Sequence, residues 1–485
     1  MGIVPLSRGC VLAIATAAFL SPAAAQTEHQ WKCTGDPNIA WDQQVVGCTH
    51  AIQSGKYLGA RLAWAYYNRG NAYFGEGEND RAIADYAQAI ALDPKFKVAY
   101  FNRGDTYRLK GDYDRAIADF THAIALDPKY AHAYRTRGIA YQAKKDYYRA
   151  IADYTQAITL DPKYAYAYID RGIAYQAKGD KDRAIADYVK AIALDPKYAL
   201  AYLNRGNAYA AKGDNDRAIA DYVKAIALDP KFAIAYNNLG DANRAKGDND
   251  PAIADYIKAI ALDPKYVLAY LNRGNAYAAK GEIDRAIADY GKAIALDPKF
   301  AIAYNNRGDA NRAKGDTDRA IADYSQAIVL DPKYALAYFS RSRLNLYSGA
   351  LPKALADLNQ ASELNPKYAY TALWLDIVNK RSNLPSRLSE ASKQIDMTKW
   401  PAPVFRLYLG QLTPEAVLAA ADDPDSSTKN DRVCEVNFYT GELALQRGAK
   451  DEATRLFRSA ASGCAKHLIE YEGAVAELKA LGVAH

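Results

Sequence analysis

A proline recurs at a constant spacing of 34 residues through the middle of this chain, and this feature limits the possible folds more than any other. A fixed period of this length is typical of an array of similar units, each packed against its neighbours. An array grows by addition, so 485 residues can fold without one very large core. Nine units occupy residues 63–368, and they contain Pro94, Pro128, Pro162, Pro196, Pro230, Pro264, Pro298, Pro332 and Pro366.

Each unit shows the pattern of two antiparallel helices. In residues 199–232, apolar and small residues recur at helical spacing in two series, with Gly206 in the first and Tyr222 in the second. The series are separated by Lys212-Gly213-Asp214, where glycine can end one helix and aspartate can cap the next. Pro230 ends the second helix, because proline disfavours helical geometry in the residue before it. We therefore expect an all-α solenoid of helix pairs.

The order of residues within a unit resembles the tetratricopeptide repeat family: a large aromatic residue, glycine and tyrosine, then alanine, an aromatic residue, alanine and proline. The resemblance covers residues 63–368. It implies a right-handed superhelix whose first helices line the concave side and which holds other proteins. The ninth unit departs from the pattern, with Ser342 in place of glycine and Leu358 in place of the aromatic residue.

Two oppositely charged residues accompany each other through the array, sixteen residues apart. The turn between the helices should bring them face to face, so we expect ion pairs within the repeats. We interpret these pairs as fixing the register of the two helices, since exposed pairs contribute only about 0–1 kcal/mol each; an electrostatic groove is the alternative. The arginines are Arg69, Arg103, Arg137, Arg171, Arg205, Arg273, Arg307 and Arg341, and the aspartates are Asp85, Asp119, Asp153, Asp187, Asp221, Asp289, Asp323 and Asp357.

Asparagine occupies one place in six of the predicted first helices, and a second polar row follows three residues later. A carboxamide offers donors and an acceptor together, which suits the backbone of an extended peptide. We therefore expect both rows to line a peptide-binding groove that prefers basic and apolar ligands, with Leu203, Asn237, Leu271 and Asn305 adding side-chain preference. The alternative is that the asparagines fix the helix pair. The first row is Asn68, Asn102, Asn204, Asn238, Asn272 and Asn306, and the second is Asn71, Asp105, Asn207, Asp241, Asn275 and Asp309.

The N-terminus predicts export. Residues 1–25 resemble a signal peptide, with an apolar run followed by Ser21-Pro22-Ala23-Ala24-Ala25, so cleavage should fall before Gln26. Cys10 precedes the apolar run, which argues against lipid attachment. Residues 26–62 should form a cap over the open end of the array. An even number of cysteines in an oxidising compartment favours the local pairs Cys33–Cys48 and Cys434–Cys464, with buried free thiols as the alternative.

The period fails at residue 369, where a separate helical module, residues 369–485, should begin. Residues 434–467 form a degenerate repeat that keeps Gly441 and Phe457 at the expected places. Antiparallel helices would bring Cys434 and Cys464 to the same end of that repeat. A last helix at residues 468–481 should close the solenoid.

Parts of this module resemble the bacterial envelope lipoprotein family NlpI. The matching segments are residues 405–410, 434–441, 470–471 and 476–482. That resemblance implies a dimeric adaptor that brings peptidoglycan hydrolases and a processing protease together in the periplasm. The longer array and the missing lipid anchor depart from the family.

Other function classes have weaker support. The sequence contains no motif for an activated nucleophile, a metal centre, a phosphate-binding loop or a cofactor, so we do not expect an enzyme. The formal charge of +6 is spread evenly, so nucleic acid is not an expected partner, and no run of residues is apolar enough to span a membrane. We expect an exported, periplasmic or secreted adaptor for protein partners. A non-catalytic binder of peptidoglycan or exopolysaccharide, using stacked tyrosines, is the alternative.

Overall fold

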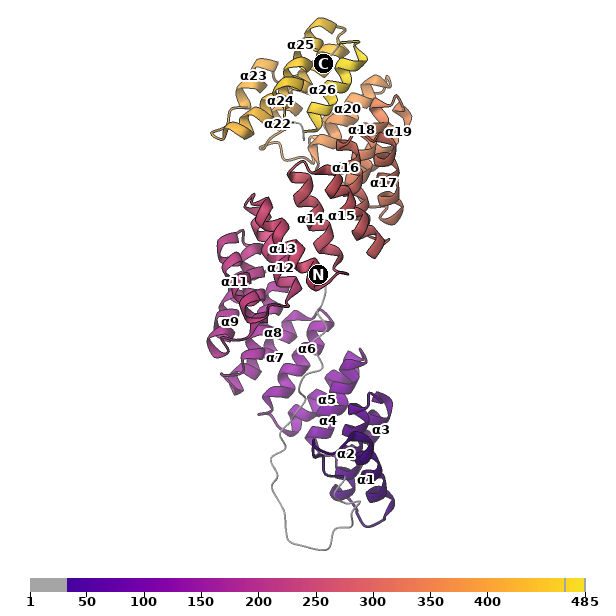
Figure 1. Cartoon of the computed structure of the whole chain (residues 1–485), viewed down its shortest axis with the longest axis vertical. Coiled ribbons are helices and arrows are strands. Elements are labelled where there is room, and N and C mark those ends of the chain that lie inside the picture. The colour runs from indigo at the N-terminus through magenta and orange to yellow at the C-terminus, as the bar shows by residue number, and fades with distance from the viewer. Residues whose placement is uncertain (1–32, 466–467, 484–485) are drawn as a thin grey trace. The chain divides into compact units, whose positions relative to one another are not determined.

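The structure is a computed structural model that describes residues 33–465 and 468–483. The predicted signal peptide, residues 1–25, and residues 26–32 of the predicted cap lie outside the described residues. All regular elements in the described ranges are helices, which confirms the all-α class. The chain divides into two compact units, Met1–Pro230 and Lys231–His485, and consecutive helices pair and stack within each of them (Figure 1).

The first unit contains a helix of the N-terminal cap followed by five helix pairs. Its helices are α1 (Trp41–Gln53), α2 (Ala60–Gly75), α3 (Asn79–Leu92), α4 (Lys97–Leu109), α5 (Tyr113–Leu126), α6 (Ala131–Ala143), α7 (Tyr147–Leu160), α8 (Ala165–Ala177), α9 (Lys181–Leu194), α10 (Ala199–Ala211) and α11 (Asn215–Leu228).

The second unit contains four further pairs and the helices of the C-terminal module. Its helices are α12 (Ala233–Ala245), α13 (Asn249–Leu262), α14 (Val267–Ala279), α15 (Ile283–Leu296), α16 (Ala301–Ala313), α17 (Thr317–Leu330), α18 (Ala335–Tyr347), α19 (Leu351–Leu364), α20 (Ala369–Arg381), α21 (Leu388–Ala391), α22 (Ala402–Tyr408), α23 (Pro414–Ala420), α24 (Ser426–Gln446), α25 (Lys450–Gly463) and α26 (Ile469–Ala480).

The turn inside each pair forms as its residues predict. Gly213 has a φ of +80°, a left-handed conformation that glycine adopts without strain, and it follows the end of α10. The Asp214 carboxylate accepts a hydrogen bond from the backbone N–H of Arg217 at 3.1 Å and so caps α11. Lys145 takes the glycine's place in the third repeat with a φ of +62°. One turn geometry is thus kept even where its preferred residue is missing.

Eight of the nine repeats close around a glycine that faces an aromatic ring. A Cβ atom added to Gly206 would lie only 2.6 Å from Cε1 of Tyr222, a side chain that is fully buried on α11. In the ninth repeat, Ser342 replaces the glycine and Leu358, which is smaller than tyrosine, replaces the ring; both side chains are buried. The predicted degenerate repeat also has this contact, since a Cβ on Gly441 would lie 2.8 Å from Cε1 of Phe457.

Both predicted disulfides are present. Cys33 bonds to Cys48 of α1, and this cap helix packs against α2. Cys434 of α24 bonds to Cys464, which directly follows α25, so the two ends of the degenerate repeat meet as predicted. α26 packs against both α24 and α25. In the described part of the chain, no helix is both long and apolar enough to cross a membrane.

Candidate functional site

The predicted ion pairs form in all eight repeats that contain both residues. Each arginine donates through Nε and Nη2 to the two carboxylate oxygens of its aspartate, at 2.6–3.0 Å. The eight aspartates are buried, with exposed fractions of 4–6%. The pairs therefore differ from the exposed pairs that the sequence suggested, and they tie the first helix to the second from a largely dehydrated position.

The asparagine rows lie on one face of the first helices. In α14, Leu268, Asn272 and Asn275 are four and three residues apart, which places them along the same side of the helix. The corresponding residues of α16 are Ile302, Asn306 and Asp309. We call this surface the first-helix face, and it contains both predicted rows.

In the first unit, the rows bond to each other across neighbouring repeats. Asn102 donates through Nδ2 to Oδ1 of Asn71 at 2.8 Å, and that same oxygen accepts a hydrogen bond from the Tyr86 hydroxyl at 2.8 Å. Asn68, the first residue of the first row, donates to the backbone carbonyl of Cys33 at 3.3 Å and so contacts the N-terminal cap. These carboxamides connect one helix pair to the next.

The second unit repeats this network. Asn272 donates to Oδ2 of Asp241 at 3.3 Å, and Asn306 donates to Oδ1 of Asn275 at 2.9 Å. Three second-row residues also accept a tyrosine hydroxyl from their own repeat at 2.7–2.9 Å: Asp241 from Tyr256, Asn275 from Tyr290 and Asp309 from Tyr324. Burial raises the pKa of Asp241, against the opposing effect of the Tyr256 hydrogen bond.

The remaining members of the rows have other surroundings. The Nδ2 group of Asn204 is buried and has no hydrogen-bond partner among the described residues. Asn207 accepts the Tyr222 hydroxyl at 2.9 Å, and Asn238 accepts a weak bond from Asn237 at 3.3 Å. Asp105 pairs with Arg108 of its own helix at 2.7 Å. The structure thus brings the rows together as an internal network, and their contact with a peptide stays a prediction.

One expected row does not line this face. Leu203, Asn237, Leu271 and Asn305 have exposed fractions of only 1–6%. Each of them directly precedes a first-row position, so it points about 100° further around the helix and packs between helices. Their predicted contribution to side-chain preference is therefore wrong.

A different row of exposed apolar side chains lines the first-helix face. Leu268, Ile302 and Leu336 lie four residues before the first-row place in α14, α16 and α18, and their exposed fractions are 41–45%. Trp64 and Tyr166 hold the same place in the first unit, with 43% and 48% exposed. The sequence signal was present, because this place is apolar or aromatic in most repeats.

The asparagine row is interrupted in the third and fourth repeats by a charged cluster. Arg135 of α6 pairs with Asp170 of α8 at 2.6 Å, and its guanidinium group lies over the rings of Tyr164 and Tyr166 at 5.6 and 5.4 Å. Nδ1 of His132 lies 2.6 Å from the Tyr164 hydroxyl. Burial raises the pKa of Asp170 and lowers that of His132. The sequence indicates this cluster at position 170, where Asp170 replaces the asparagine of the first row.

One recurring row of tyrosines, which could have stacked on a sugar, belongs to the core. The residues corresponding to Tyr222 in the other repeats are buried, with exposed fractions of 0–2%; they are Tyr86, Tyr154, Tyr188, Tyr256, Tyr290 and Tyr324. Their rings pack against the repeat glycines, as the Gly206–Tyr222 contact shows. This row therefore does not offer stacking surfaces to a ligand.

The C-terminal module contains buried carboxylates that sequence reasoning missed. Glu435 accepts hydrogen bonds from Tyr370 and Trp400 at 2.9–3.1 Å, and Arg381 donates to both Glu442 and Glu477 at 2.7–2.8 Å. Burial raises the pKa of Glu435 and of Glu442 to about 7. These carboxylates are buried in the helical packing, with exposed fractions of 1–6%. They therefore affect the stability of the module and do not contact a substrate in solution.

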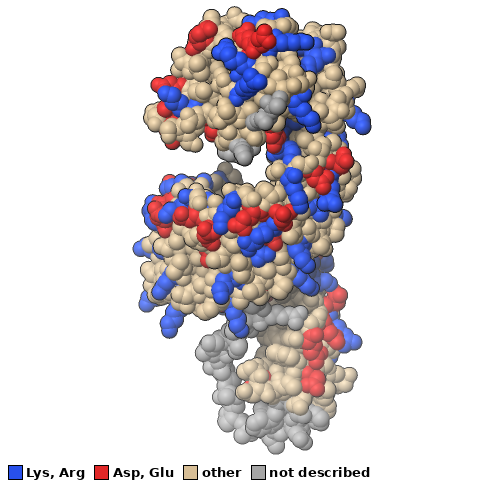
Figure 2. All heavy atoms as spheres, turned by 45° about the horizontal axis from the view of Figure 1, so that its top comes forward, with Lys and Arg blue, Asp and Glu red and all other residues tan. Residues whose placement is uncertain are grey.

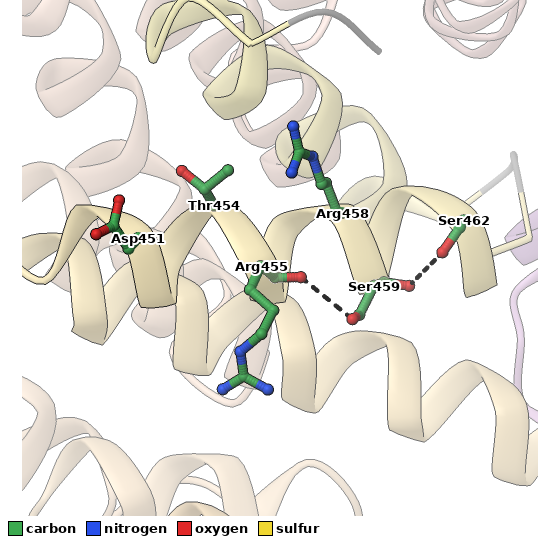
Figure 3. Close-up of a pocket in the computed structure, with 6 residues that line it drawn as sticks. All are labelled: Asp451, Thr454, Arg455, Arg458, Ser459 and Ser462. Atoms are coloured by element: carbon green, nitrogen blue, oxygen red, sulfur yellow. Dashed lines mark hydrogen bonds between the residues drawn. The ribbon is translucent and has the colours of Figure 1, made fainter.

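A pocket on the outer side of α25 is formed by residues of that helix, among them Asp451, Arg455 and Arg458. Figure 3 shows the two guanidinium groups pointing to opposite sides of the helix. They do not converge on one point, so the pocket lacks the geometry of an anion site. Among the described residues, no group of three or more His, Cys, Asp or Glu side chains could hold a metal ion. On the face shown in Figure 2, basic and acidic side chains are interspersed.

Family models match the chain without a gap from residue 67 to residue 341. The description "Tetratricopeptide repeat" applies to residues 67–131, 131–164 and 153–186, and "TPR repeat" applies to 177–213, 206–247, 240–281, 274–312 and 308–341.

Solved structures of repeat proteins also align with parts of the chain. The crystal structure of MamA is 34% identical over 33% of this chain and 95% of its own, with a TM-score of 0.32. YrrB, described as a TPR protein with an unusual peptide-binding site, is 26% identical over 38% of this chain and 95% of its own, with a TM-score of 0.33. A repeat protein from Parabacteroides merdae ATCC 43184 is 20% identical over 52% and 98%, with a TM-score of 0.43. By its repeats, the chain belongs to the tetratricopeptide repeat family.

Proposed function

We propose that this chain is an exported scaffold that binds peptide or protein partners on its first-helix face. The observation that carries the proposal is the apolar row of Leu268, Ile302 and Leu336, which recurs at the same place in three consecutive first helices and stays 41–45% exposed. Repeated exposed apolar side chains weaken solubility and are typical of interaction surfaces. Membership of a repeat family whose stacked helices serve as interaction scaffolds supports the same function.

The polar rows lie beside the apolar row and complement it. Asp241 and Asp309 alternate with Asn275 along consecutive first helices, and all three are partly accessible to solvent. A partner that lays apolar side chains on Leu268, Ile302 and Leu336 would present its polar groups to this acidic and amide row. Peptides that mix apolar and basic residues fit this arrangement best.

The proposed compartment is the bacterial envelope, with a periplasmic or secreted chain. The signal-like residues 1–25 and the two disulfides support it, because disulfides persist in oxidising compartments. The resemblance of the C-terminal module to NlpI suggests peptidoglycan hydrolases or an envelope protease as partners, and a dimer as the working form. Mass spectrometry of exported material should find Gln26 as the first residue and all four remaining cysteines oxidised; free thiols throughout would contradict this location.

The scaffold function is tested by capture of partners with matched variants of the mature chain. Leu268, Ile302 and Leu336 are changed together to glutamine, which favours helix and removes the apolar surface. The control changes Val189, Val223 and Ile257 to glutamine, since they are equally exposed apolar residues but lie on second helices. We expect the wild type and the control to retain the same envelope proteins and the first-helix variant to lose them at unchanged helicity. Equal capture by both variants would refute the proposed surface.

A further inference from the structure

Two consecutive first helices in the second unit, and α20 of the C-terminal module, direct arginines at α26. Arg312 of α16 and Arg343 of α18 both contact Glu472 of α26, the latter with Nη1 at 3.5 Å from Oε2. Arg381 of α20 contacts Glu477 of α26 at 2.7 Å. Each of these helices thus reaches a carboxylate of α26 by an ion pair.

The contacts of Arg312 and Arg343 lie on the first-helix face. Arg343 occupies the second-row place, 34 residues after Asp309 and 68 after Asn275. Arg312 is three residues beyond Asp309 on α16, and its Nε lies 3.9 Å from Oδ1 of Asp309. The polar row therefore changes from amide and acidic residues to arginine where α26 covers it.

The two arginines are incompletely satisfied by Glu472. Arg343 is 5% exposed, and the Nε atoms of both Arg312 and Arg343 are buried without a hydrogen-bond partner among the described residues. Burial, and then the charge of Arg312, lowers the pKa of Arg343. A buried guanidinium group with an unused donor is costly, so this place favours an acidic ligand that can fill it.

α26 packs on α24 and α25 through apolar side chains, and it also approaches α18 closely at Gly473. A Cβ atom on Gly473 would lie 2.8 Å from the Tyr347 hydroxyl and 2.6 Å from the Phe438 ring, so only glycine allows this contact. Ala474 and Leu478 are the fully buried apolar side chains that α26 contributes to the core. Toward α16 and α18, α26 makes ion pairs through Glu472, and these are the contacts that an acidic competitor can replace.

We propose that α26 is a built-in ligand of the first-helix face, and that Glu472 occupies an acidic-peptide site formed by Arg312 and Arg343. The partner that fits this site is a helical peptide with a glutamate or aspartate at the place of Glu472. It gains access when α26 is displaced, so the chain regulates the C-terminal end of its own binding surface. This inference rests on the proposed use of the first-helix face for binding.

The test uses the full mature chain and a fluorescein-labelled peptide of residues 468–483, whose binding is measured by fluorescence anisotropy. The chain variant Glu472→Gln weakens the internal contact, so it should bind the peptide at least about tenfold more tightly than the wild type does. A peptide that itself contains Glu472→Gln should bind this variant about tenfold more weakly. Adding Arg343→Gln to the chain variant should reduce binding, whereas adding Arg458→Gln, an exposed arginine of α25, should not.

Equal peptide affinity of the wild type and Glu472→Gln would overturn the proposal, as would a failure of Glu472→Gln to bind the peptide at all. Equal binding of the wild-type peptide and the Glu472→Gln peptide would overturn it too. This comparison changes only the peptide, so it does not depend on the folding of a further chain variant. The assay does not involve the partners captured through Leu268, Ile302 and Leu336. A loss of those partners and a loss of peptide binding are therefore separate results.

Discussion

At the scale of single residues, Leu239 shows what the arginine–aspartate pairs contribute. It replaces arginine in the sixth repeat, while the aspartate of that repeat, Asp255, is kept. Among the described residues, Asp255 then accepts a side-chain hydrogen bond only from Asn243, at 2.9 Å, and burial raises its pKa to about 6. The eighth repeat has the complete arrangement, in which Arg307 and Asn311 both donate to Asp323.

Leu239→Arg should therefore stabilise the second unit at neutral pH. In the wild type the pKa of Asp255 is higher in the folded chain than in the unfolded chain, so stability is lost as pH rises from about 4 to about 6. An arginine partner lowers the pKa and removes that loss, which we expect to add about 1 kcal/mol at pH 7.5 and much less at pH 4.5. Urea unfolding at the two pH values measures the effect. Leu239→Met is the control; an equal pH dependence of both variants would contradict the prediction.

At the scale of helices, the asparagine rows connect neighbouring repeats, which the arginine–aspartate pairs do not. The arginine–aspartate bonds stay within one helix pair, whereas Asn272 and Asn306 donate to the preceding repeat. Asn204 has the same place in α10 but its Nδ2 group makes no hydrogen bond to a described residue. The same residue type thus contributes differently in different repeats.

Replacement by alanine should separate these roles. Asn272→Ala and Asn306→Ala each remove a hydrogen bond between repeats, so each should cost about 1 kcal/mol relative to Asn204→Ala. The gain in helix propensity from alanine is common to all three variants and cancels in the comparison. Unfolding midpoints in urea, followed by circular dichroism, give the three values. If Asn204→Ala is as destabilising as the other two, the hydrogen bonds are not the cause of the loss.

At the scale of the whole molecule, the C-terminal module adds a pH dependence that extends to higher pH than that of Asp255 in the repeats. Glu470 is 1% exposed, accepts a hydrogen bond from Tyr439 at 3.1 Å and lies near Glu435 and Arg343. Burial, and then the charge of Glu435, raises the pKa of Glu470 to about 8. Ionisation of this group at high pH places a buried negative charge near Glu435, inside the packing of α24 and α26.

Glu470→Gln should make the module more stable at pH 8 and leave it nearly unchanged at pH 5. The pKa of Glu470 is raised in the folded chain, so its stabilising contribution is complete below the unfolded pKa of about 4.5 and is lost as pH rises to about 8. Glutamine can still accept the Tyr439 hydrogen bond, and the expected gain at pH 8 is on the order of 2 kcal/mol. Hydrogen exchange in α24 and α26 measures it. Glu452→Gln on α25 is the control, and a similar gain from that variant would rule out Glu470 as the source.

Most of the fold follows from the sequence because its contacts are local and periodic. The turn at Gly213, the packing of Gly206 on Tyr222 and the pairing of Arg205 with Asp221 all join residues less than 20 positions apart. Spacing along a helix and the geometry of one turn determine which of these side chains meet. The same reasoning placed Cys434 beside Cys464, since both lie near the same end of one helix pair.

Only the tertiary structure decided what the candidate site contacts. The sequence placed the asparagine rows on one face, but the acceptors of Asn272 and Asn306 lie in neighbouring repeats, at positions set by the stacking of helix pairs. Leu271 and Leu268 are both apolar residues of the same helix, but the stacking of helix pairs buries Leu271 and leaves Leu268 exposed. The contact of Glu472 with Arg312 joins residues 160 positions apart, outside any period. A repeating sequence determines the contacts within its unit, whereas contacts between distant segments depend on how the helices pack in space.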